Sequence, residues 1–309
     1  MQDWNSLHIF LELTRSRGLV EAGKRLNIDH STVSRRIRQF EQKIGTQLFE
    51  RSNQGYTLTA AGHRLIAYAE RAELAMLAAI EELGGQDPLL SGHVRLGTTE
   101  GFGMFLAPAL LADFCEQHPG ITVDLLPMPR FINMSKREAD ISISLDRPQS
   151  GNYVVARLTN YSLRVYATRA YLESHPPIRT QADLAKHNFA GYIDELVYTE
   201  ELRYERNIAP SAFRPLRSNS IVSQYSVARY GRMLAILPCF IGQQCPELVP
   251  VLKDQINITR TFWLAVPTET RHIRRISALW DYLRDAANNN QAYFRGEALE
   301  PLWLTKTRS

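Results

Sequence analysis

Residues 30–43 of this 309-residue chain read HSTVSRRIRQFEQK. Apolar side chains recur at helical spacing from this stretch into the next residue, which predicts a helix with one buried stripe of Val33, Ile37, Phe40 and Ile44. On its other face, hydroxyl and imidazole side chains come first and arginines follow, as is typical of a helix that enters the major groove of DNA by its N-terminal end. A solvated helix face explains any single arginine better, but the whole arrangement predicts DNA contacts at His30, Ser31, Thr32, Ser34, Arg35, Arg36 and Arg38.

The segments on either side of this helix predict a small domain around it. Apolar residues at helical spacing predict one helix near residues 7–14 and a second over 20–26. A tight turn at residues 27–29 then leads into the third helix. Residues 47–59 predict a β-hairpin with its turn at Asn53-Gln54-Gly55. Arg51 lies on this hairpin, where it is a further candidate DNA contact, along the backbone or in a minor groove.

Positive charge is concentrated in the same part of the chain. Residues 1–66 contain ten Lys and Arg against six Asp and Glu, whereas the remaining residues contain 26 of each sign. A basic head on a neutral body indicates a polyanionic partner for the head. An excess this small is also compatible with chance, so charge alone does not decide the matter.

The stretch from Leu7 to Gly62 closely resembles the DNA-binding domain of LysR-type transcriptional regulators. The residues that carry the resemblance are Phe10, Ala22, Leu26, Val33, Ser34, Ile37, Glu41, Gly45, Leu48-Phe49-Glu50-Arg51 and Leu58-Thr59-Ala60-Ala61-Gly62. The resemblance implies a mainly α-helical, winged helix-turn-helix domain over residues 1–58 that binds double-stranded DNA. The chain departs from the family pattern at residues 30–32, where bases are read, so the resemblance does not imply a target sequence.

A long helix is predicted after this domain. Residues 60–83 contain strong helix formers, and small or apolar side chains recur there at alternating spacings of three and four. We predict a linker and dimerisation segment over 59–88 that ends in a hinge, and the resemblance implies a homodimer and further a homotetramer. A helix packed on its own domain is the alternative. The predicted dimer seam consists of Leu65, Ala69, Ala72, Met76, Ala79 and Leu83.

From residue 93 onward, predicted strands and helices alternate, which indicates α/β organisation. Their order resembles the effector-binding domain of the same family, which is similar to periplasmic solute-binding proteins. The resemblance implies two lobes over residues 89–290, with lobe one at about 89–160 and 261–290 and lobe two at about 161–260. One uninterrupted helix is expected over 102–116. Residues 291–309 look like an appended helix or tail.

A small-molecule effector is expected between the lobes, at strand ends and helix starts where free N–H groups point outward. Thr98, Thr99 and Ser220 are equally well explained as helix caps. Glu100 disfavours an anionic ligand, whereas Arg130 and Arg147 favour one, so the charge of the effector stays open. The predicted effector contacts are Thr98, Thr99, Glu100, Asp146, Asn219, Ser220, Val222 and Pro238.

Three other classes of protein compete with a regulator. The eight histidines are scattered and the sequence contains no HExxH pair, P-loop or GxSxG elbow, so we expect no enzyme, no catalytic residues, no metal site and no cofactor. A redox sensor would use Cys239 and Cys245, but two small buried residues after an apolar strand explain them better. An architectural DNA-binding protein without a ligand is the third alternative.

Composition also indicates the compartment. Three widely spaced cysteines suit a reducing environment and give no disulfide framework. Residues 1–14 carry no Lys or Arg, unlike a secretory signal. The longest apolar run, residues 102–112, is interrupted by Pro108 and is too short to span a bilayer. We therefore expect a cytoplasmic protein with no membrane partner.

Overall fold

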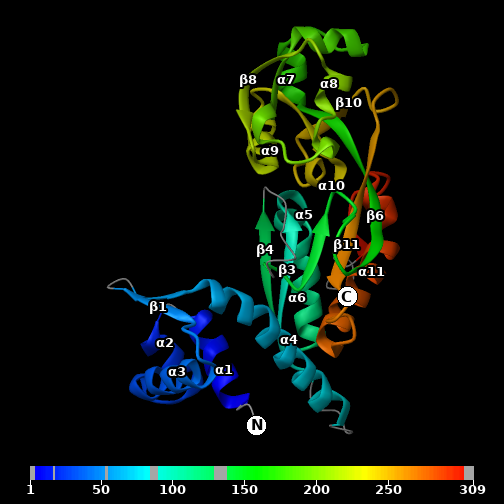
Figure 1. Cartoon of the computed structure of the whole chain (residues 1–309). Coiled ribbons are helices and arrows are strands. Elements are labelled where there is room, and N and C mark those ends of the chain that lie inside the picture. The colour runs from blue at the N-terminus through cyan, green and yellow to red at the C-terminus, as the bar shows by residue number, and fades with distance from the viewer. Residues whose placement is uncertain (1–3, 17, 53–54, 84–89, 129–137, 303–309) are drawn as a thin grey trace. The chain divides into compact units, whose positions relative to one another are not determined.

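The computed structural model describes residues 4–16, 18–52, 55–83, 90–128 and 138–302 (Figure 1). The chain divides into an N-terminal unit, Met1–Gln86, and a C-terminal unit, Asp87–Ser309. The hinge expected at the end of the linker segment and residues 303–309 of the expected tail lie outside the described residues. No helix in the described ranges has both the length and the apolar character that a membrane span needs.

The N-terminal unit consists of helices and one hairpin, as the sequence predicts. Its elements are α1 (Trp4–Thr14), α2 (Leu19–Leu26), α3 (His30–Ile44), β1 (Phe49–Ser52), β2 (Gly55–Leu58) and α4 (Ala60–Leu83). The hairpin is antiparallel, with Phe49 opposite Leu58. The predicted inner stripe of α3 is confirmed at three positions, because Val33 and Ile37 are fully buried and Phe40 is 8% exposed. It is wrong at Ile44, which is the last residue of the helix and is 36% exposed.

Local backbone features fix both ends of α3. Asn27 adopts a left-handed conformation with φ of 53°, which turns the chain sharply after α2. Asp29 is the N-cap, and its carboxylate accepts a hydrogen bond from the Ser31 N–H at 2.8 Å. Gly45 ends the helix with φ of 67°, a conformation that a side chain disfavours. These features orient the start of α3 independently of distant parts of the chain.

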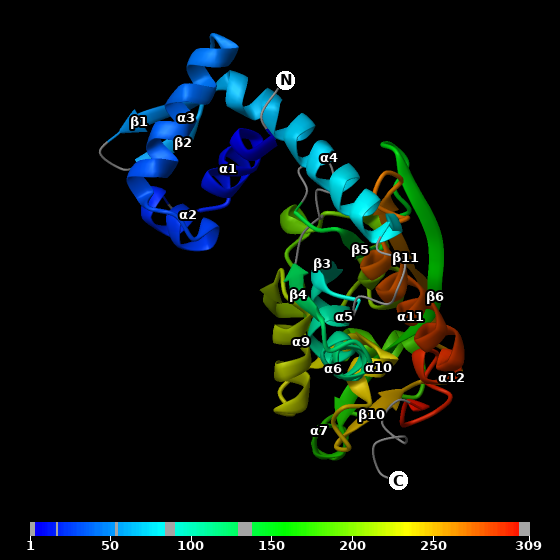
Figure 2. The ribbon, with the colours of Figure 1, turned by 90° about the horizontal axis from the view of Figure 1, so that it is seen from below.

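The first half of α4 belongs to the core of the N-terminal unit. Figure 2 shows α4 beginning beside the bundle of the first three helices. Ala69 of α4 is fully buried in this core, and Leu65 and Ile66 pack against it. The other buried members are Ile9, Phe10, Leu11, Leu13, Ala22, Val33, Ile37, Phe40, Leu48 and Phe49.

The C-terminal unit contains one nine-stranded sheet that runs through two lobes. Its path follows the order β4-β3-β5-β11-β6-β9-β7-β8, and β10 pairs with β6. Strands β4, β3 and β5 are parallel to one another, as are β9, β7 and β8. The strands are β3 (Gly92–Thr99), β4 (Ile121–Met128), β5 (Ile141–Ser144), β6 (Tyr153–Thr168), β7 (Asn188–Tyr192), β8 (Phe213–Ser218), β9 (Leu234–Pro238), β10 (Leu248–Val251) and β11 (Ile258–Pro267).

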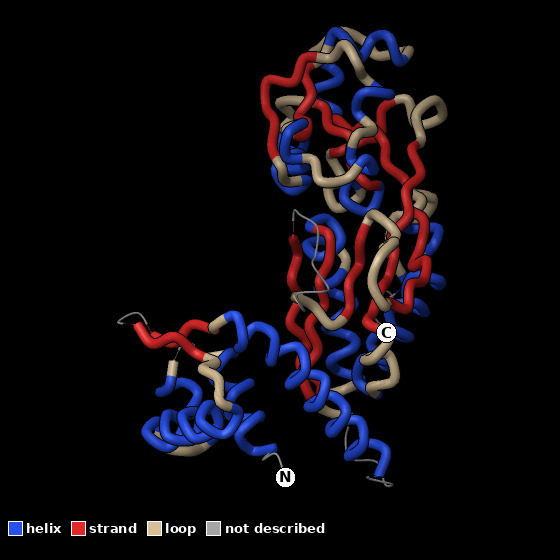
Figure 3. Tube along the Cα trace, in the orientation of Figure 1, coloured by secondary structure: helices blue, strands red, loops and turns tan. Residues whose placement is uncertain are grey.

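Two long strands connect the lobes. In Figure 3, β6 and β11 run side by side from one lobe to the other, and they pair antiparallel along their length. Their register shifts between Phe262 and Trp263, opposite residues 157–159. A shift of this kind bends a strand locally. The sequence predicts crossings between the lobes near residues 159–160 and 261, and these residues belong to β6 and β11.

One predicted helix is wrong in its continuity. The expected helix over 102–116 is two helices, because Leu106 interrupts it and Pro108 lies in the first turn of the second. Proline lacks the N–H that a continuing helix needs, but it fits a helix start. The helices of this unit are α5 (Glu100–Phe105), α6 (Ala107–Gln117), α7 (Arg169–Ser174), η2 (Gln181–Lys186), η3 (Asp194–Leu196), η4 (Glu200–Leu202), α8 (Glu205–Ile208), α9 (Ile221–Arg229), α10 (Cys239–Gly242), α11 (Arg274–Asn289) and α12 (Gln291–Phe294).

The segment expected as an appended tail is part of lobe two where the structure describes it. Tyr293 and Phe294 of α12 are 3% and 1% exposed. The Gln244 amide donates to the Tyr293 hydroxyl at 2.8 Å, and the Phe294 ring packs against Phe240. Residues 291–294 therefore support the element that carries Phe240.

Candidate DNA-binding surface and interlobe pocket

The outer face of α3 presents polar side chains to solvent. Ser31, Arg35 and Arg38 are exposed and lie opposite the buried stripe. Gln39 and Gln42 are exposed on the same face. The sequence prediction omitted these two glutamines, although they follow Arg35 at helical spacing and an amide can pair with adenine.

The other predicted positions of α3 flank this face. His30 is exposed beside the N-cap, whereas Thr32 and Ser34 are half-buried. Arg36 is half-buried too, and it borders a surface hollow together with His8, Glu12 and Arg25 of α1 and α2. Ser31, Arg35 and Arg38 therefore have the most direct access to a groove, and Arg36 lies toward the side of the helix.

The β1–β2 hairpin forms the wing of this domain, and a buried carboxylate connects the start of the wing to α3. The Glu41 carboxylate accepts hydrogen bonds from the N–H groups of Leu48 and Phe49 at 2.9 and 3.1 Å. Glu41 is 9% exposed, so these bonds form largely away from water. The backbone of Arg51 lies in β1, but its side chain lies outside the description.

Ion pairs hold α4 against α1. Arg15 pairs with Glu12 at 3.2 Å and with Glu73 of α4 at 2.6 Å, and Arg25 pairs with Glu12 at 3.2 Å. His8, Glu12 and Glu73 also lie close enough together to hold a metal ion. Because arginines already neutralise both carboxylates, the arrangement is explained as an ion-pair network.

The predicted dimer seam of α4 divides into two parts. Ala69 is fully buried within the single chain and Leu65 packs on the same core, so the packed-helix alternative describes these two positions. Ala72 is half-buried, and Met76 is 44% exposed. Ala79 and Leu83 have side chains outside the description. A residue without exposed surface gains little from a second subunit, so Met76, the most exposed of the described seam positions, has the most surface left to bury.

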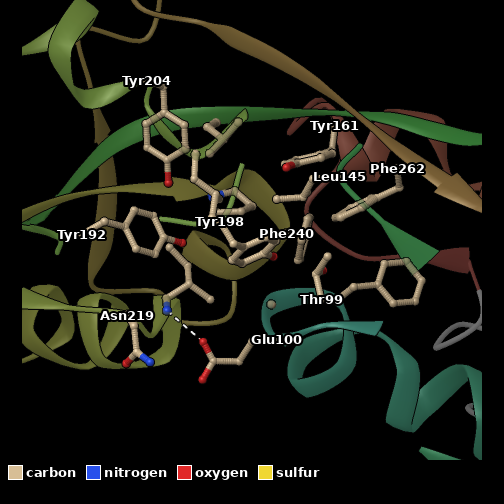
Figure 4. Close-up of a pocket in the computed structure, with 16 residues that line it drawn as sticks. Thr99, Glu100, Leu145, Tyr161, Tyr192, Tyr198, Tyr204, Asn219, Phe240 and Phe262 are labelled. Carbon is tan, nitrogen blue, oxygen red and sulfur yellow. Dashed lines mark hydrogen bonds between the residues drawn. The ribbon is translucent and has the colours of Figure 1, made fainter. Parts of the chain in front are cut away.

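The ends of parallel strands in the two lobes meet around a cavity of about 50 Å³. Thr99, Tyr192 and Pro238 are the last residues of β3, β7 and β9, and Leu145 and Asn219 follow β5 and β8. Strand ends of this kind carry ligand sites in α/β folds, because the chain leaves the sheet there and helices begin. The wall is drawn in Figure 4.

Four predicted effector residues line this pocket: Thr99, Glu100, Asn219 and Pro238. Four others do not: Thr98, Asp146, Ser220 and Val222. The cap explanation is confirmed for Ser220, whose hydroxyl accepts from the Ser223 N–H at the start of α9. Thr99 occupies the cap position of α5 without a capping side-chain bond. Thr98 is fully buried, and its hydroxyl has no hydrogen-bond partner among the described residues.

Two carboxylates of lobe one reach helix starts in lobe two. The Glu100 carboxylate accepts from the Ser220 hydroxyl at 2.8 Å. It also accepts from the Ile221 N–H at 2.9 Å, the bond dashed in Figure 4. The Asp146 carboxylate accepts from the Thr199 hydroxyl at 2.8 Å, beside η4. These bonds connect the lobes on the pocket side of the crossover strands.

Of the two arginines considered as carboxylate partners, the structure describes Arg147. The Arg147 guanidinium lies 5.5 Å from the centroid of the Trp263 ring. Arg147 does not belong to the described lining. Arg130 lies outside the described residues.

Sequence reasoning missed the aromatic part of the wall. In Figure 4, Tyr192 and Tyr204 lie on one side and Tyr161 and Phe262 on the other. The Tyr161 and Phe262 rings stack with centroids 4.2 Å apart. Burial raises the pKa of Tyr192 and Tyr204 well above the usual range, so their hydroxyls stay protonated. The sequence pattern predicts a strand over Phe189–Tyr192, so the position of Tyr192 at a strand end follows from the sequence. The pairing of the crossover strands that brings Tyr161 and Phe262 together does not.

The two cysteines considered for redox sensing are free and buried. Burial raises the pKa of both the Cys239 and the Cys245 thiol, which lowers the thiolate fraction. Because the thiolate is the reactive form, this environment favours packing over redox chemistry.

Family models match both units. The model described as "Bacterial regulatory helix-turn-helix protein, lysR family" matches residues 4–63, and the one described as "LysR substrate binding domain" matches residues 88–288. Among curated relatives, the HTH-type transcriptional regulator PtxR of Pseudomonas aeruginosa is 25% identical over 243 residues, which cover 77% of each protein.

Two solved structures share the fold. CrgA, a LysR-type transcriptional regulator from Neisseria meningitidis, has a TM-score of 0.57 at 22% identity and covers 94% of this chain and 100% of its own. LysG from Corynebacterium glutamicum, solved with bound effector Arg, has a TM-score of 0.60 at 17% identity and covers 93% and 98%. Since the two family models together match most of its length, the chain belongs to the LysR family of transcriptional regulators, with a helix-turn-helix DNA-binding domain and an effector-binding domain.

Proposed function

We propose that this chain is a cytoplasmic, homo-oligomeric regulator that binds a specific DNA sequence, and that a small-molecule effector in the interlobe pocket controls its affinity for DNA. The pocket carries this proposal, because strand ends of both lobes line one cavity beside the crossover. A ligand there contacts both lobes and therefore favours one arrangement of them over another. LysG, which shares the fold, is described with a bound effector. The proposal needs no catalytic step, metal or cofactor.

DNA recognition rests on the outer face of α3. Ser31, Arg35 and Arg38 supply a short hydroxyl and two long cations on an exposed face. We assign base reading to this face and backbone contacts to the wing. An architectural protein without sequence preference would need the basic charge but not this order of side chains.

Transmission from effector to DNA depends on α4. Arg15 and Ala69 hold its first half firmly to the DNA-binding domain. A change in how two α4 helices pair would therefore move the two recognition helices with them. In this scheme the effector shifts the population of arrangements that match the spacing of two half-sites.

Selection of bound duplexes from a random DNA pool tests the function. The full-length protein is used at near-physiological salt, because electrostatic binding weakens steeply with salt. Enrichment of a dyad-symmetric site is the expected result. Recovery of DNA without a shared motif contradicts sequence-specific regulation and favours an architectural protein.

Dimerisation through the outer part of α4 gives a first prediction. Met76→Asp places a charge on the exposed continuation of the seam, so we expect dimer dissociation in sedimentation velocity with an intact N-terminal fold. Leu65→Asp is the contrasting variant, because it lies in the intrachain core and should unfold the N-terminal unit instead. An unchanged oligomer for Met76→Asp contradicts the assignment, and the dimer-of-dimers tetramer is read from the same experiment.

A further inference from the structure

The interlobe pocket has a single charged group in its described wall. Among the sixteen described residues that line it, Glu100 is the one acidic side chain, and none is a lysine, arginine or histidine. Arg260, which influences Tyr161 electrostatically, is already paired with Glu201 at 2.7 Å. An anionic ligand therefore finds no cationic partner in the described lining.

The position that attracts an anion in such folds is already filled by the chain itself. The start of α9 directs the Ile221 N–H (dashed line in Figure 4) and the Ser220 hydroxyl at the Glu100 carboxylate. Helix starts bind anions because these donors and the helix dipole point outward. A ligand carboxylate would compete for the same donors and would also meet the like charge of Glu100.

The rest of the wall favours a cation. Aromatic faces attract ammonium groups, since the ring faces are negative. Burial raises the pKa of Tyr198 to about 12, and the negative charges of Asp146 and Glu100 act in the same direction. The aromatic side chains of the wall are Phe102, Tyr161, Tyr192, Tyr198, Tyr204, Phe240 and Phe262.

We propose that Glu100 sets the charge of the effector: the pocket binds a small organic cation with an ammonium group and rejects carboxylates. This rests on the proposed function in that the pocket is the effector site. An ionised carboxylate offers about four acceptor positions, so Glu100 can keep its bonds to Ser220 and Ile221 and still accept from an ammonium group. Glu100 thus bridges the lobes and supplies the counter-charge.

The size of the cavity limits the ligand group that enters the pocket. Its volume of about 50 Å³ corresponds to a few water molecules at roughly 10–15 Å³ each. Probes of a few heavy atoms therefore fit best. Propylammonium, propanol and propanoate share one carbon chain and differ chiefly in charge.

The first test measures the thermal stability of the full-length wild-type protein with each of these probes. Propylammonium should raise Tm by about 3–6 °C at ten times its Kd. Propanol should give a smaller shift and propanoate none. An equal response to all three probes, a response to propanoate that matches the ammonium, or no response to propylammonium overturns the proposal.

The second test removes the Glu100 carboxylate from the start of α9. Glu100→Ala removes the heavy atoms that acetate contains, so acetate should raise the Tm of this variant and not that of the wild type. Glu116→Ala, an exposed glutamate on α6, is the matched control and should not respond. Glu100→Gln keeps a hydrogen-bond acceptor without the charge and should lose the preference for propylammonium over propanol. Acetate responses that are the same in all four proteins contradict the assignment.

DNA binding is measured in parallel to separate this inference from the proposed function. If charge selection depends on Glu100 but no probe changes affinity for the selected DNA, the effector proposal fails and the inference about the pocket stands. If probes change DNA affinity irrespective of charge in the wild type and in Glu100→Gln, the effector proposal stands and the inference fails.

Discussion

At the starts of α3 and α9, a carboxylate accepts a hydrogen bond from a backbone N–H group. The two carboxylates differ in how far they lie from their donors along the chain. At α3 the carboxylate belongs to Asp29, two residues before its donor Ser31. At α9 it belongs to Glu100, 121 residues before its donor Ile221. The local carboxylate completes one helix and leaves its outer face open to a partner. The distant one joins two lobes and occupies the place where a ligand group would bind.

Because of this difference, the geometry at the start of α3 is fixed locally, whereas the geometry at the start of α9 can change with the arrangement of the lobes. The start of α3 keeps its geometry as long as its own turn is folded, so it suits a reader of DNA. The start of α9 has its partner only when the lobes are together, so its state depends on their arrangement.

Glu41 lies between these two cases in sequence separation, because its carboxylate accepts a hydrogen bond from Leu48, seven residues later in the chain. Glu41→Ala leaves two largely buried N–H groups without their acceptor, so the N-terminal unit should lose about 2–4 kcal/mol in the free energy of unfolding. Hydrogen exchange of residues 30–58 reads this loss locally. Glu50→Ala, an exposed glutamate of β1, is the control. Equal protection in both variants means that the wing does not depend on Glu41.

Arg35 tests whether the open face of α3 reads bases. Arg35→Ala should weaken binding to the selected site by about 1–3 kcal/mol, with a smaller loss on random DNA. Titration of both duplexes at one salt concentration measures the difference. Equal losses on the two duplexes make Arg35 a phosphate contact, and base reading then falls to the other exposed residues of α3.

A substitution at Ser220 tests the bond between Glu100 and the start of α9 without removing the charge of Glu100. Ser220→Ala deletes the hydroxyl that donates to Glu100 and accepts from Ser223, so the C-terminal unit should lose about 1 kcal/mol. Ser211→Ala, an exposed serine of the same lobe, should cost less. Urea denaturation compares the two. If the costs are equal, the bridge contributes nothing measurable to stability.

Asp29 gives the smallest effect, seen in the pH dependence. Hydrogen bonds from Ser31 hold the pKa of Asp29 below its usual value. Its stabilisation is therefore present above the usual pKa of about 4 and is lost as the pH falls through the lower folded value. Asp29→Asn should flatten this acid decline in hydrogen exchange at the start of α3. Parallel profiles for the variant and the wild type contradict a capping role.

The same contrast explains what the sequence could predict. The stripe of α3, its capping turn and its exposed arginines follow from spacing within one element, and the structure has them there. Of the predicted pocket residues, Thr99 and Pro238 follow from strand ends. Tyr198 and Tyr204 lie in an aperiodic segment between η3 and α8, so no local pattern places them.

Two further features depend on packing between distant segments. Phe262 stacks on Tyr161 through the pairing of the crossover strands, and strand patterns alone do not give that register. The spacing in α4 is the same whether a side chain packs on its own domain or on a second subunit. Ala69 therefore fits the predicted seam and yet lies in the core of the single chain.

The most direct test of the account is the affinity for the selected DNA with and without propylammonium, for the wild type and for Glu100→Gln. We predict that propylammonium changes the Kd of the wild type at fixed salt, that propanoate does not, and that the variant responds little to either. An equal response of the two proteins, or a wild type that responds to propanoate as it does to propylammonium, contradicts the claim that the Glu100 bridge couples the pocket to DNA.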